Sequence, residues 1–263
     1  MKILVIGGTG LIGSKLVSKL AEHGHEPVPA SPRLGVNTIT GEGLATALDG
    51  TSVVVDVSNS ANFEYTTSLL FFERSTHNLL DAEARADVGH HVALSVVGTT
   101  KLSQSGDPET TTAGYFRAKR TEEDIIAASG IPYSIVHATQ FFEFIKGIAD
   151  EATDRGAVRV PPVRFQPMAA DDVAAAVGRV AVGSPVNGIV EVGGPEQFRF
   201  DELMRRVLRV WDDPREVVTD PDAGYYGIAV GDRTLVPADG ARLGVVRIDD
   251  WLRQSATANP VSV

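Results

Sequence analysis

The sequence contains no cysteine among its 263 residues. This absence excludes disulfide bonds, thiolate catalysis and cysteine-ligated metal sites. It agrees with a reducing compartment, and we expect a cytoplasmic protein. Six histidines are present, but they show no metal-ligand spacing; His90 and His91, for example, are adjacent and would point to opposite faces of a strand. The sequence therefore predicts no metal site.

Long apolar runs and an excess of positive charge are also lacking. No window reaches the length of a membrane span, and the apolar run of residues 2–6 is too short for a secretory signal. The formal net charge of −10 disfavours binding to a phosphate backbone or an anionic bilayer. We therefore expect neither nucleic acid nor a membrane as a partner, and the sequence leaves the oligomeric state open.

What the chain does contain is a regular alternation of strand and helix patterns. Strands are predicted at residues 2–6, 25–31, 52–57, 92–97, 133–138 and 189–192, and helices at residues 11–23, 69–85, 117–129, 172–182 and 201–211. Short connections in such an alternation predict an α/β fold with a Rossmann-type, doubly wound parallel sheet covered by helices on both faces. This fold usually builds a small substrate lobe from the C-terminal third, where Trp211, Tyr225 and Tyr226 lie; most of these rings are expected to pack in the core.

Three local features qualify this prediction. Pro27 and Pro29 lie two apart in the second strand, so one of its hydrogen-bonding edges should be weak. Asp201 is the expected N-cap of its helix. Residues 101–114 are polar and rich in turn formers, which predicts a loop that acts as a lid over a neighbouring site.

The segment "GGTGLIG" follows the first strand and opens the first helix. Gly7 would permit the tight turn, Gly10 would let backbone approach a pyrophosphate, and Gly13 would let the helix pack closely. The strand before it and the helix after it are the context that a dinucleotide-binding loop requires. The loop residues expected to contact the cofactor are Gly7, Thr9, Gly10, Leu11 and Ile12.

The end of the second strand bears on which dinucleotide binds. An acidic residue there would bind the ribose hydroxyls of NAD, but the segment reads "ASPRLG". Ser31 and Arg33 are suited to a 2′-phosphate, so the sequence favours NADP(H) over NAD(H). An ordinary solvated arginine would give the same pattern, and the sequence leaves that alternative open.

Several further motifs occur in a characteristic order. They are "DVSNS" after the third strand, "ALSVVG" on the fourth, "GYFRAK" on the next helix, and later "IPYSIVHATQFFEF", "FQPMAADDVA" and "GIVEVGGPEQF". Together with the glycine loop they resemble the short-chain dehydrogenase/reductase superfamily, and more narrowly its NmrA-like, atypical extended branch. His137 departs from that branch, in which an arginine is common at this position.

The resemblance implies roles for particular residues. Tyr115 would be the proton donor, Lys119 would bind the nicotinamide ribose and lower the pKa of the phenol, and Ser95 would donate a hydrogen bond to a substrate carbonyl. Ser58 and Asn59 would lie beside the cofactor, and Thr139, Gln140 and Phe141 near the nicotinamide. Physically, Tyr115 and Lys119 lie one helical turn apart, and a nearby ammonium favours a phenolate. A solvated Tyr-x-x-x-Lys pair would look identical in sequence.

These observations lead to a prediction of function. We expect residues 1–138 to form a dinucleotide-binding Rossmann core, and residues 139–263 to complete the core and form the interleaved substrate lobe. The expected activity is NADP(H)-dependent reduction of a carbonyl or quinone in a small, apolar or cyclic substrate. Two alternatives remain at this point: an NmrA-like sensor that binds dinucleotide without turnover, and an epimerase or dehydratase that recycles its nucleotide.

Overall fold

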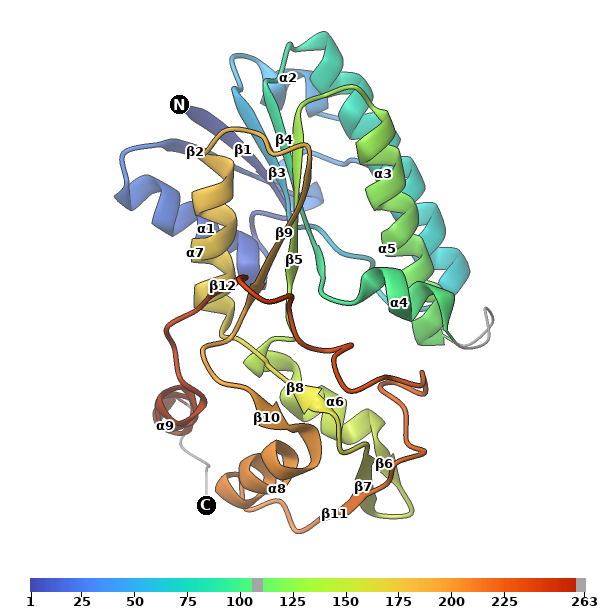
Figure 1. Cartoon of the computed structure of the whole chain (residues 1–263). Coiled ribbons are helices and arrows are strands. Elements are labelled where there is room, and N and C mark those ends of the chain that lie inside the picture. The colour runs from blue at the N-terminus through green and yellow to red at the C-terminus, as the bar shows by residue number, and fades with distance from the viewer. Residues whose placement is uncertain (106–110, 259–263) are drawn as a thin grey trace.

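A computed structural model describes residues 1–105 and 111–258 of the chain. Its centre is a seven-stranded sheet in which each neighbouring pair is parallel, in the order β12-β9-β5-β4-β3-β1-β2 (Figure 1). The strands are β1 (Lys2–Ile6), β2 (Glu26–Ala30), β3 (Val53–Asp56), β4 (His90–Val96), β5 (Tyr133–Ala138), β9 (Gly188–Gly193) and β12 (Arg242–Leu243). The predicted α/β class with a doubly wound parallel sheet is confirmed.

Helices cover both faces of the sheet. On one face, α1 (Leu11–Glu22) packs against α7 (Ala170–Ala181); on the other, α3 (Tyr65–Arg85) packs against α5 (Thr111–Ala128), with α2 (Leu44–Leu48) beside α3 (Figure 1). The buried stripe of α1 contains Ile12, Leu16 and Leu20, which share an apolar cluster with Val173 and Val177 of α7. Burial of these two stripes against β1, β3 and β4 fixes the helices to the sheet.

The two prolines of β2 lie at an edge of the sheet. Pro27 pairs with Ile3 and Pro29 with Val5 of β1, while the N–H of Glu26 donates to Met1. Because N–H groups alternate along a strand, the two proline nitrogens face away from β1, where the sheet has no further strand among the described residues. The predicted weak edge is therefore the outer edge, where a missing N–H costs no ladder hydrogen bond.

The segment between β4 and α5 is more helical than its composition predicts. Residues 99–104 form α4 (Thr99–Gln104), and α5 begins at Thr111 instead of residue 117. The predicted lid falls partly on residues 106–110, which lie outside the described residues. Gly114 does not break α5: a Cβ there would come within 2.4 Å of Tyr65 Cβ, so glycine serves the close approach of α3 and α5.

A lobe lies below the carboxyl ends of the strands (Figure 1). It is built from α6 (Ile145–Glu151), a three-stranded sheet of β6 (Thr153–Asp154), β7 (Ala157–Val160) and β11 (Glu216–Thr219), a pair of β8 (Arg164–Phe165) with β10 (Phe198–Arg199), α8 (Phe200–Val210) and α9 (Ile248–Ala258). Stacked Phe165 and Phe200 belong to an apolar cluster that also holds Phe116 of α5. The predicted division at residue 138 stays a prediction.

Asp201 differs from its predicted role as a cap. Arg199 occupies the N-cap position of α8, and Asp201 lies buried in the first turn. Its carboxylate accepts hydrogen bonds from Arg199, Arg205 and Thr219, at 2.6–3.0 Å. The residue therefore ties α8 to β11 through its side chain, a tertiary contact that the capping pattern does not contain.

Candidate active site

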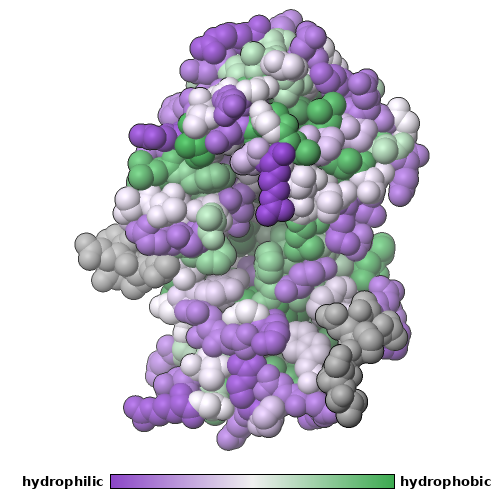
Figure 2. Space-filling model, turned by 180° about the vertical axis from the view of Figure 1, so that it is seen from behind, coloured by the Kyte–Doolittle hydropathy of each residue, from purple (hydrophilic) through white to green (hydrophobic). Residues whose placement is uncertain are grey.

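A cleft of about 730 Å³ opens at the carboxyl ends of β1, β3, β4 and β5, between the sheet and the lobe. Figure 2 shows the surface hollowed at mid-height, with hydrophobic residues gathered around the hollow. In parallel sheets, ligands bind at such carboxyl ends, where the direction of winding reverses; here that point lies between β1 and β3. The predicted site residues that line the cleft are Gly7, Thr9, Gly10, Leu11, Ile12, Ser31, Ser58, Asn59, Ser95, Tyr115, Lys119, Thr139 and Phe141.

The glycine loop has the geometry that a pyrophosphate site needs. Gly7 has a φ of +76°, and its N–H donates to Ala30 at the end of β2. A Cβ at Gly13 would lie 2.1 Å from the carbonyl oxygen of Gly7, so the first turn of α1 rests directly on the loop. No side chain caps α1, and its first turn holds no acidic residue. Its leading N–H groups and positive dipole end suit an anionic group in the cleft.

The adenosine end of the cleft differs from the prediction at one residue. Ser31 is buried, and its hydroxyl has no hydrogen-bond partner within the described residues, which suits a ligand. Arg33 is exposed on a short 3₁₀ turn (Pro32–Leu34) and does not line the cleft. The structure thus brings Ser31 to the site and leaves Arg33 outside. Asn37 and Thr38 line the cleft nearby, and sequence reasoning missed both.

Tyr115 is a buried residue of α5 that lines the cleft. Its hydroxyl donates to Asn59 Oδ1 at 3.2 Å, and its ring packs edge-on against Phe63 with the ring centroids 4.9 Å apart. Burial raises the pKa of Tyr115, and the opposing effect of Lys119 does not overcome it. Lys119 thus acts on the pKa of this phenol in the predicted direction, but in the protein without ligand burial has the larger effect.

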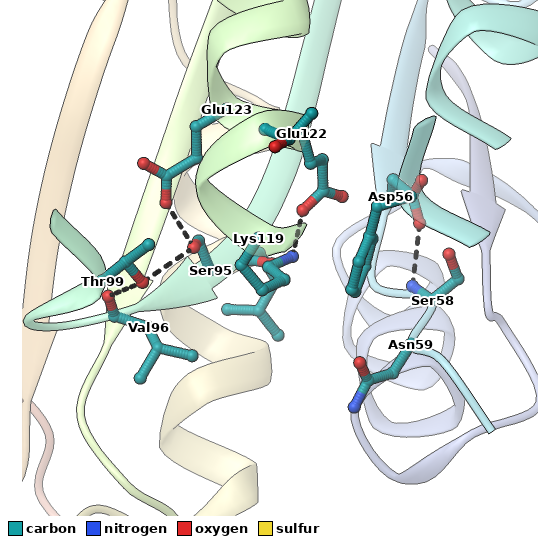
Figure 3. Close-up of polar contacts among 12 residues, drawn as sticks. Asp56, Ser58, Asn59, Ser95, Val96, Thr99, Lys119, Glu122 and Glu123 are labelled. Atoms are coloured by element: carbon teal, nitrogen blue, oxygen red, sulfur yellow. Dashed lines mark hydrogen bonds and ion pairs between the residues drawn. The ribbon is translucent and has the colours of Figure 1, made fainter. Parts of the chain in front are cut away.

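Lys119 reaches the cleft from the same face of α5. Its Nζ donates to the carbonyl oxygen of Leu94 at 2.9 Å, lies 4.6 Å from the Phe72 ring centroid, and forms an ion pair with Glu122 (Figure 3). Burial lowers the pKa of Lys119, but the carboxylate of Glu122 outweighs it, so the pKa is raised. Sequence reasoning missed Glu122; its position three residues after the lysine was the available signal.

Ser95 is engaged by a second buried carboxylate. Its hydroxyl donates to Glu123 Oε1 at 2.5 Å, and His137 Nε2 lies 2.9 Å from the same oxygen (Figure 3). Burial raises the pKa of Glu123, but His137 and Ser95 outweigh burial and the net shift is downward. The hydroxyl proton of Ser95 is thus held away from the cleft, so a hydrogen bond to a substrate carbonyl requires this contact to change.

Polar groups without partners follow β5. The hydroxyl of Thr139 and both polar atoms of the Gln140 side chain are buried and have no hydrogen-bond partner within the described residues. Both residues line the cleft, beside Phe141, whose ring stacks on Phe144. Buried polar groups are normally paired, so these atoms indicate that a polar ligand group belongs in this part of the cleft.

Most of the remaining lining is aromatic or aliphatic. Phe63, Phe71, Phe116, Phe144, Tyr225 and Tyr226 contribute rings to the cleft. Among the lining residues, the charged side chains are Lys119 and Glu143. The carboxylate of Glu143 accepts hydrogen bonds from the backbone N–H of Ala170 and from Trp251 Nε1. Phe142, by contrast, is buried in the core of the lobe. The lobe side of the cleft therefore suits an apolar molecule.

The described residues were also searched for a metal site and for a membrane-spanning helix. Within residues 1–105 and 111–258, no group of three or more His, Cys, Asp or Glu side chains is arranged to hold a metal ion. Across the same part of the chain, no helix combines the length and apolar character that crossing a bilayer demands.

The sequence is similar to those of known proteins. A family model described as NAD(P)H-binding matches residues 7–181. The chain is 33% identical to a 3-beta-hydroxysteroid dehydrogenase of Mycolicibacterium neoaurum, over 48% of this chain and 41% of the relative. It is 26% identical to the photosystem II assembly factor Ycf39 of Cyanophora paradoxa, over 56% of this chain and 48% of that protein. The match thus spans less than half the length of these curated relatives.

Solved structures match almost the whole fold. A short-chain dehydrogenase/reductase superfamily protein from Agrobacterium tumefaciens with bound NAD has a TM-score of 0.73 at 18% identity, covering 98% of this chain and 97% of that one. The UDP-glucose 4-epimerase of Thermus thermophilus with NAD has a TM-score of 0.68 at 18% identity, over 100% of both chains. The narrower NmrA-like assignment stays a prediction. With the glycine loop, the strand order and the family model in agreement, the chain belongs to the NAD(P)H-binding family.

Proposed function

We propose that the protein is an NADP(H)-dependent oxidoreductase that reduces the carbonyl or quinone of a small apolar or cyclic substrate, with Tyr115 as the proton donor. The observation that carries this proposal is the position of Tyr115 and Lys119. Both face the cleft from one side of α5, between the dinucleotide loop and the aromatic lobe. A hydride donor and a substrate placed in this cleft would both lie beside the phenol.

The residues present fit a dinucleotide. The glycine loop and the start of α1 would hold its pyrophosphate, Ser31 would meet the adenosine end, and the unpaired groups of Thr139 and Gln140 would meet the nicotinamide end. The bound nicotinamide supplies the hydride in this chemistry. Ser31 supports the preference for NADP(H); Arg33 would support it only by turning toward the cleft.

The chain's own part in the reaction is to position the substrate and to move a proton. The aromatic lining would orient an apolar carbonyl compound and exclude water. Tyr115 would give its proton to the developing alkoxide, exchanging its contact with Asn59 for one with the substrate. Lys119 would stabilise the phenolate left behind. Ser95 would donate a hydrogen bond to the substrate oxygen once its hydroxyl turns away from Glu123.

The decisive experiment replaces Tyr115 by Phe. NADPH oxidation is measured spectrophotometrically with a panel of apolar ketones and quinones, beside the dissociation constant for NADPH. General acid catalysis contributes about 10²–10⁴-fold, so kcat is expected to fall by about that factor while cofactor affinity holds. A Tyr115→Phe variant that turns over as fast as the wild type would remove the phenol from the mechanism.

One observation favours a second candidate, a dinucleotide sensor without turnover. The hydroxyl of Ser95 donates its hydrogen bond to Glu123, and burial raises the pKa of Tyr115, so in the ligand-free protein the serine is engaged elsewhere and the phenol is a weaker acid than usual. Tight NADPH binding with no turnover on any panel member, together with partner capture that depends on the redox state of the nucleotide, would favour the sensor. Steady NADPH oxidation would rule it out as the sole function.

An epimerase acting on a nucleotide sugar is less well supported. The glycine loop would hold the pyrophosphate of the cofactor, so the diphosphate of a nucleotide sugar would need a second anion site. The cationic group among the lining residues is Lys119, which is already paired with Glu122. Product formation without net change in nicotinamide absorbance would favour this third reading.

A further inference from the structure

The helix that carries Tyr115 presents a third ionisable residue on the same face. Tyr115, Lys119 and Glu122 lie at successive turns of α5, with spacings of four and three residues. All three are buried: 8% of Tyr115, 2% of Lys119 and 3% of Glu122 is exposed. Figure 3 shows the carboxylate of Glu122 pointing at the ammonium of Lys119. The lysine is thus shared between a phenol and a carboxylate, and both compete for its charge.

The hydrogen bonds of Lys119 show how far this competition goes. An ammonium has three N–H donors. One is used by the carbonyl oxygen of Leu94 and another by Glu122, while the ring of Phe72 covers the ammonium from the side. At most one donor remains for the phenol or for a ligand. Glu122 therefore both holds the ammonium in place and opposes its electrostatic effect on Tyr115.

The surroundings of Glu122 favour uptake of a proton near neutral pH. The charged and titratable groups that face it are Tyr115, Lys119 and Glu123 from α5, Asp56 from β3, and His91 from β4, which is paired with Glu83 of α3. Burial raises the pKa of Glu122 to about 7; Lys119 opposes this shift and Asp56 adds to it. The charge on Glu122 is therefore variable in the pH range in which enzymes usually work.

We propose that Glu122 is a positioning residue for Tyr115 that acts through Lys119: as a carboxylate it offsets the ammonium, and as a neutral carboxyl it leaves the ammonium to favour the phenolate. The inference rests on the proposed role of Tyr115 as the proton donor. It deepens that role by assigning the control of phenol acidity to a residue that is not among those lining the cleft.

The test measures the titration of one phenol directly. The full-length protein is prepared with a ring-fluorinated tyrosine, which lowers phenol pKa values into a range where the fold is stable, and fluorine NMR follows the five tyrosines. The resonance missing from Tyr115→Phe identifies the phenol. Glu122→Gln keeps a hydrogen-bond acceptor for Lys119 but removes the charge, so the pKa of Tyr115 is expected to fall by about one unit. An unchanged pKa overturns the proposal.

Two comparisons separate this effect from a general loss of structure. Asp124→Asn removes the same charge from an exposed site on α5 that pairs with Arg120, and is expected to leave the Tyr115 titration unchanged. In the wild type, the Tyr115 resonance should show an additional inflection near pH 7 as Glu122 titrates. Its absence overturns the proposal even if Glu122→Gln fails to fold.

The dependence of kcat/KM on pH tests the same proposal through activity. Below the pKa of Glu122, the wild type and Glu122→Gln both carry an uncharged side chain at position 122, so their pH profiles of kcat/KM should coincide. Above that pKa the wild type carries a carboxylate, and the two profiles should diverge. Glu122→Asp, which restores the carboxylate, should return the profile toward that of the wild type. Normal turnover by Tyr115→Phe would refute the proposed function instead, and would leave the measured link between Glu122 and the phenol intact.

Discussion

Gly13→Ala offers the sharpest test of how the dinucleotide loop is built. The added Cβ would lie 2.1 Å from the carbonyl oxygen of Gly7, and 2.7 Å from both the carbonyl carbon of Gly7 and the Cα of Gly8. All three are backbone atoms, so no side chain can rotate out of the way. Contacts between carbon and oxygen rarely fall below about 3 Å, which means that the first turn of α1 must move by about 1 Å away from the loop.

The size of the effect follows from that displacement. Overpacking at a buried site costs about 1–3 kcal/mol. In a chain of this length each kcal/mol shifts Tm by about 2–4 °C, so we expect Tm to fall by about 2–12 °C. The N–H groups at the start of α1 would also move relative to a pyrophosphate. Hydrogen bonds to charged groups contribute about 1.5–3 kcal/mol, so the dissociation constant for NADPH should rise by about ten- to a hundredfold.

Calorimetry and fluorescence titration with NADPH measure both quantities. Gly89→Ala is the matched control, because Gly89 is exposed, lies outside the cleft, and its added Cβ would have its nearest neighbour at an ordinary 3.7 Å. It should melt and bind as the wild type does. If Gly13→Ala also melts and binds normally, the loop and helix do not hold the cofactor in the way argued above.

Three further substitutions test other parts of the structure. Gly114→Ala places a Cβ 2.4 Å from Tyr65 Cβ and should lower stability by about 1–3 kcal/mol, measured by chemical denaturation. Burial would raise the pKa of Asp201, but its hydrogen-bond donors outweigh burial and hold that pKa far below its usual range. Asp201→Asn should therefore cost about 1–3 kcal/mol at pH 7, and the difference from the wild type should shrink as the pH falls below about 4, where the unfolded carboxyl takes up its proton. If Arg33 turns toward a 2′-phosphate, Arg33→Ala should weaken the binding of NADPH and leave the binding of NADH unchanged. Equal dissociation constants for NADPH and NADH in the wild type would contradict the proposed preference for NADP(H).

The elements with strong local signals could be predicted from the sequence. Strands β1 and β5 have the predicted bounds, because β-branched runs flanked by turn residues leave little alternative. The glycine loop was predictable from the spacing of its glycines at the joint between a strand and a helix. The start of α5 was missed because residues 101–114 were interpreted as a turn-rich loop, whereas the role of Gly114 is decided by Tyr65 on another helix. A glycine that serves packing and one that ends a helix look alike until the neighbouring helix is placed.

The candidate site was predictable as a set of positions but not as a set of interactions. Spacing on α5 placed Tyr115 and Lys119 together, and strand ends placed Ser95 and Thr139 at the same edge of the sheet. The partners of these residues depend on tertiary packing. Glu123 comes from a helix, yet it meets side chains of two neighbouring strands, Ser95 of β4 and His137 of β5. Nothing in the linear pattern tells which face of the helix is buried deeply enough for this contact.

The buried carboxylates under the cleft argue for a role beyond stability. Asp56, Glu122 and Glu123 are each less than 5% exposed, and Lys119 is the one fully buried ammonium beside them among the described residues. Removing such charges from water costs several kcal/mol for each ion, and apolar residues of similar volume commonly give an equally stable or more stable protein. A cluster of this kind is thus a poor way to hold α5 against the sheet. It is an effective way to hold a phenol and an ammonium at chosen protonation states. Lys119 and Glu122 share α5 with Tyr115 and act on the pKa of its phenol, which is where such control would reach the proposed proton donor.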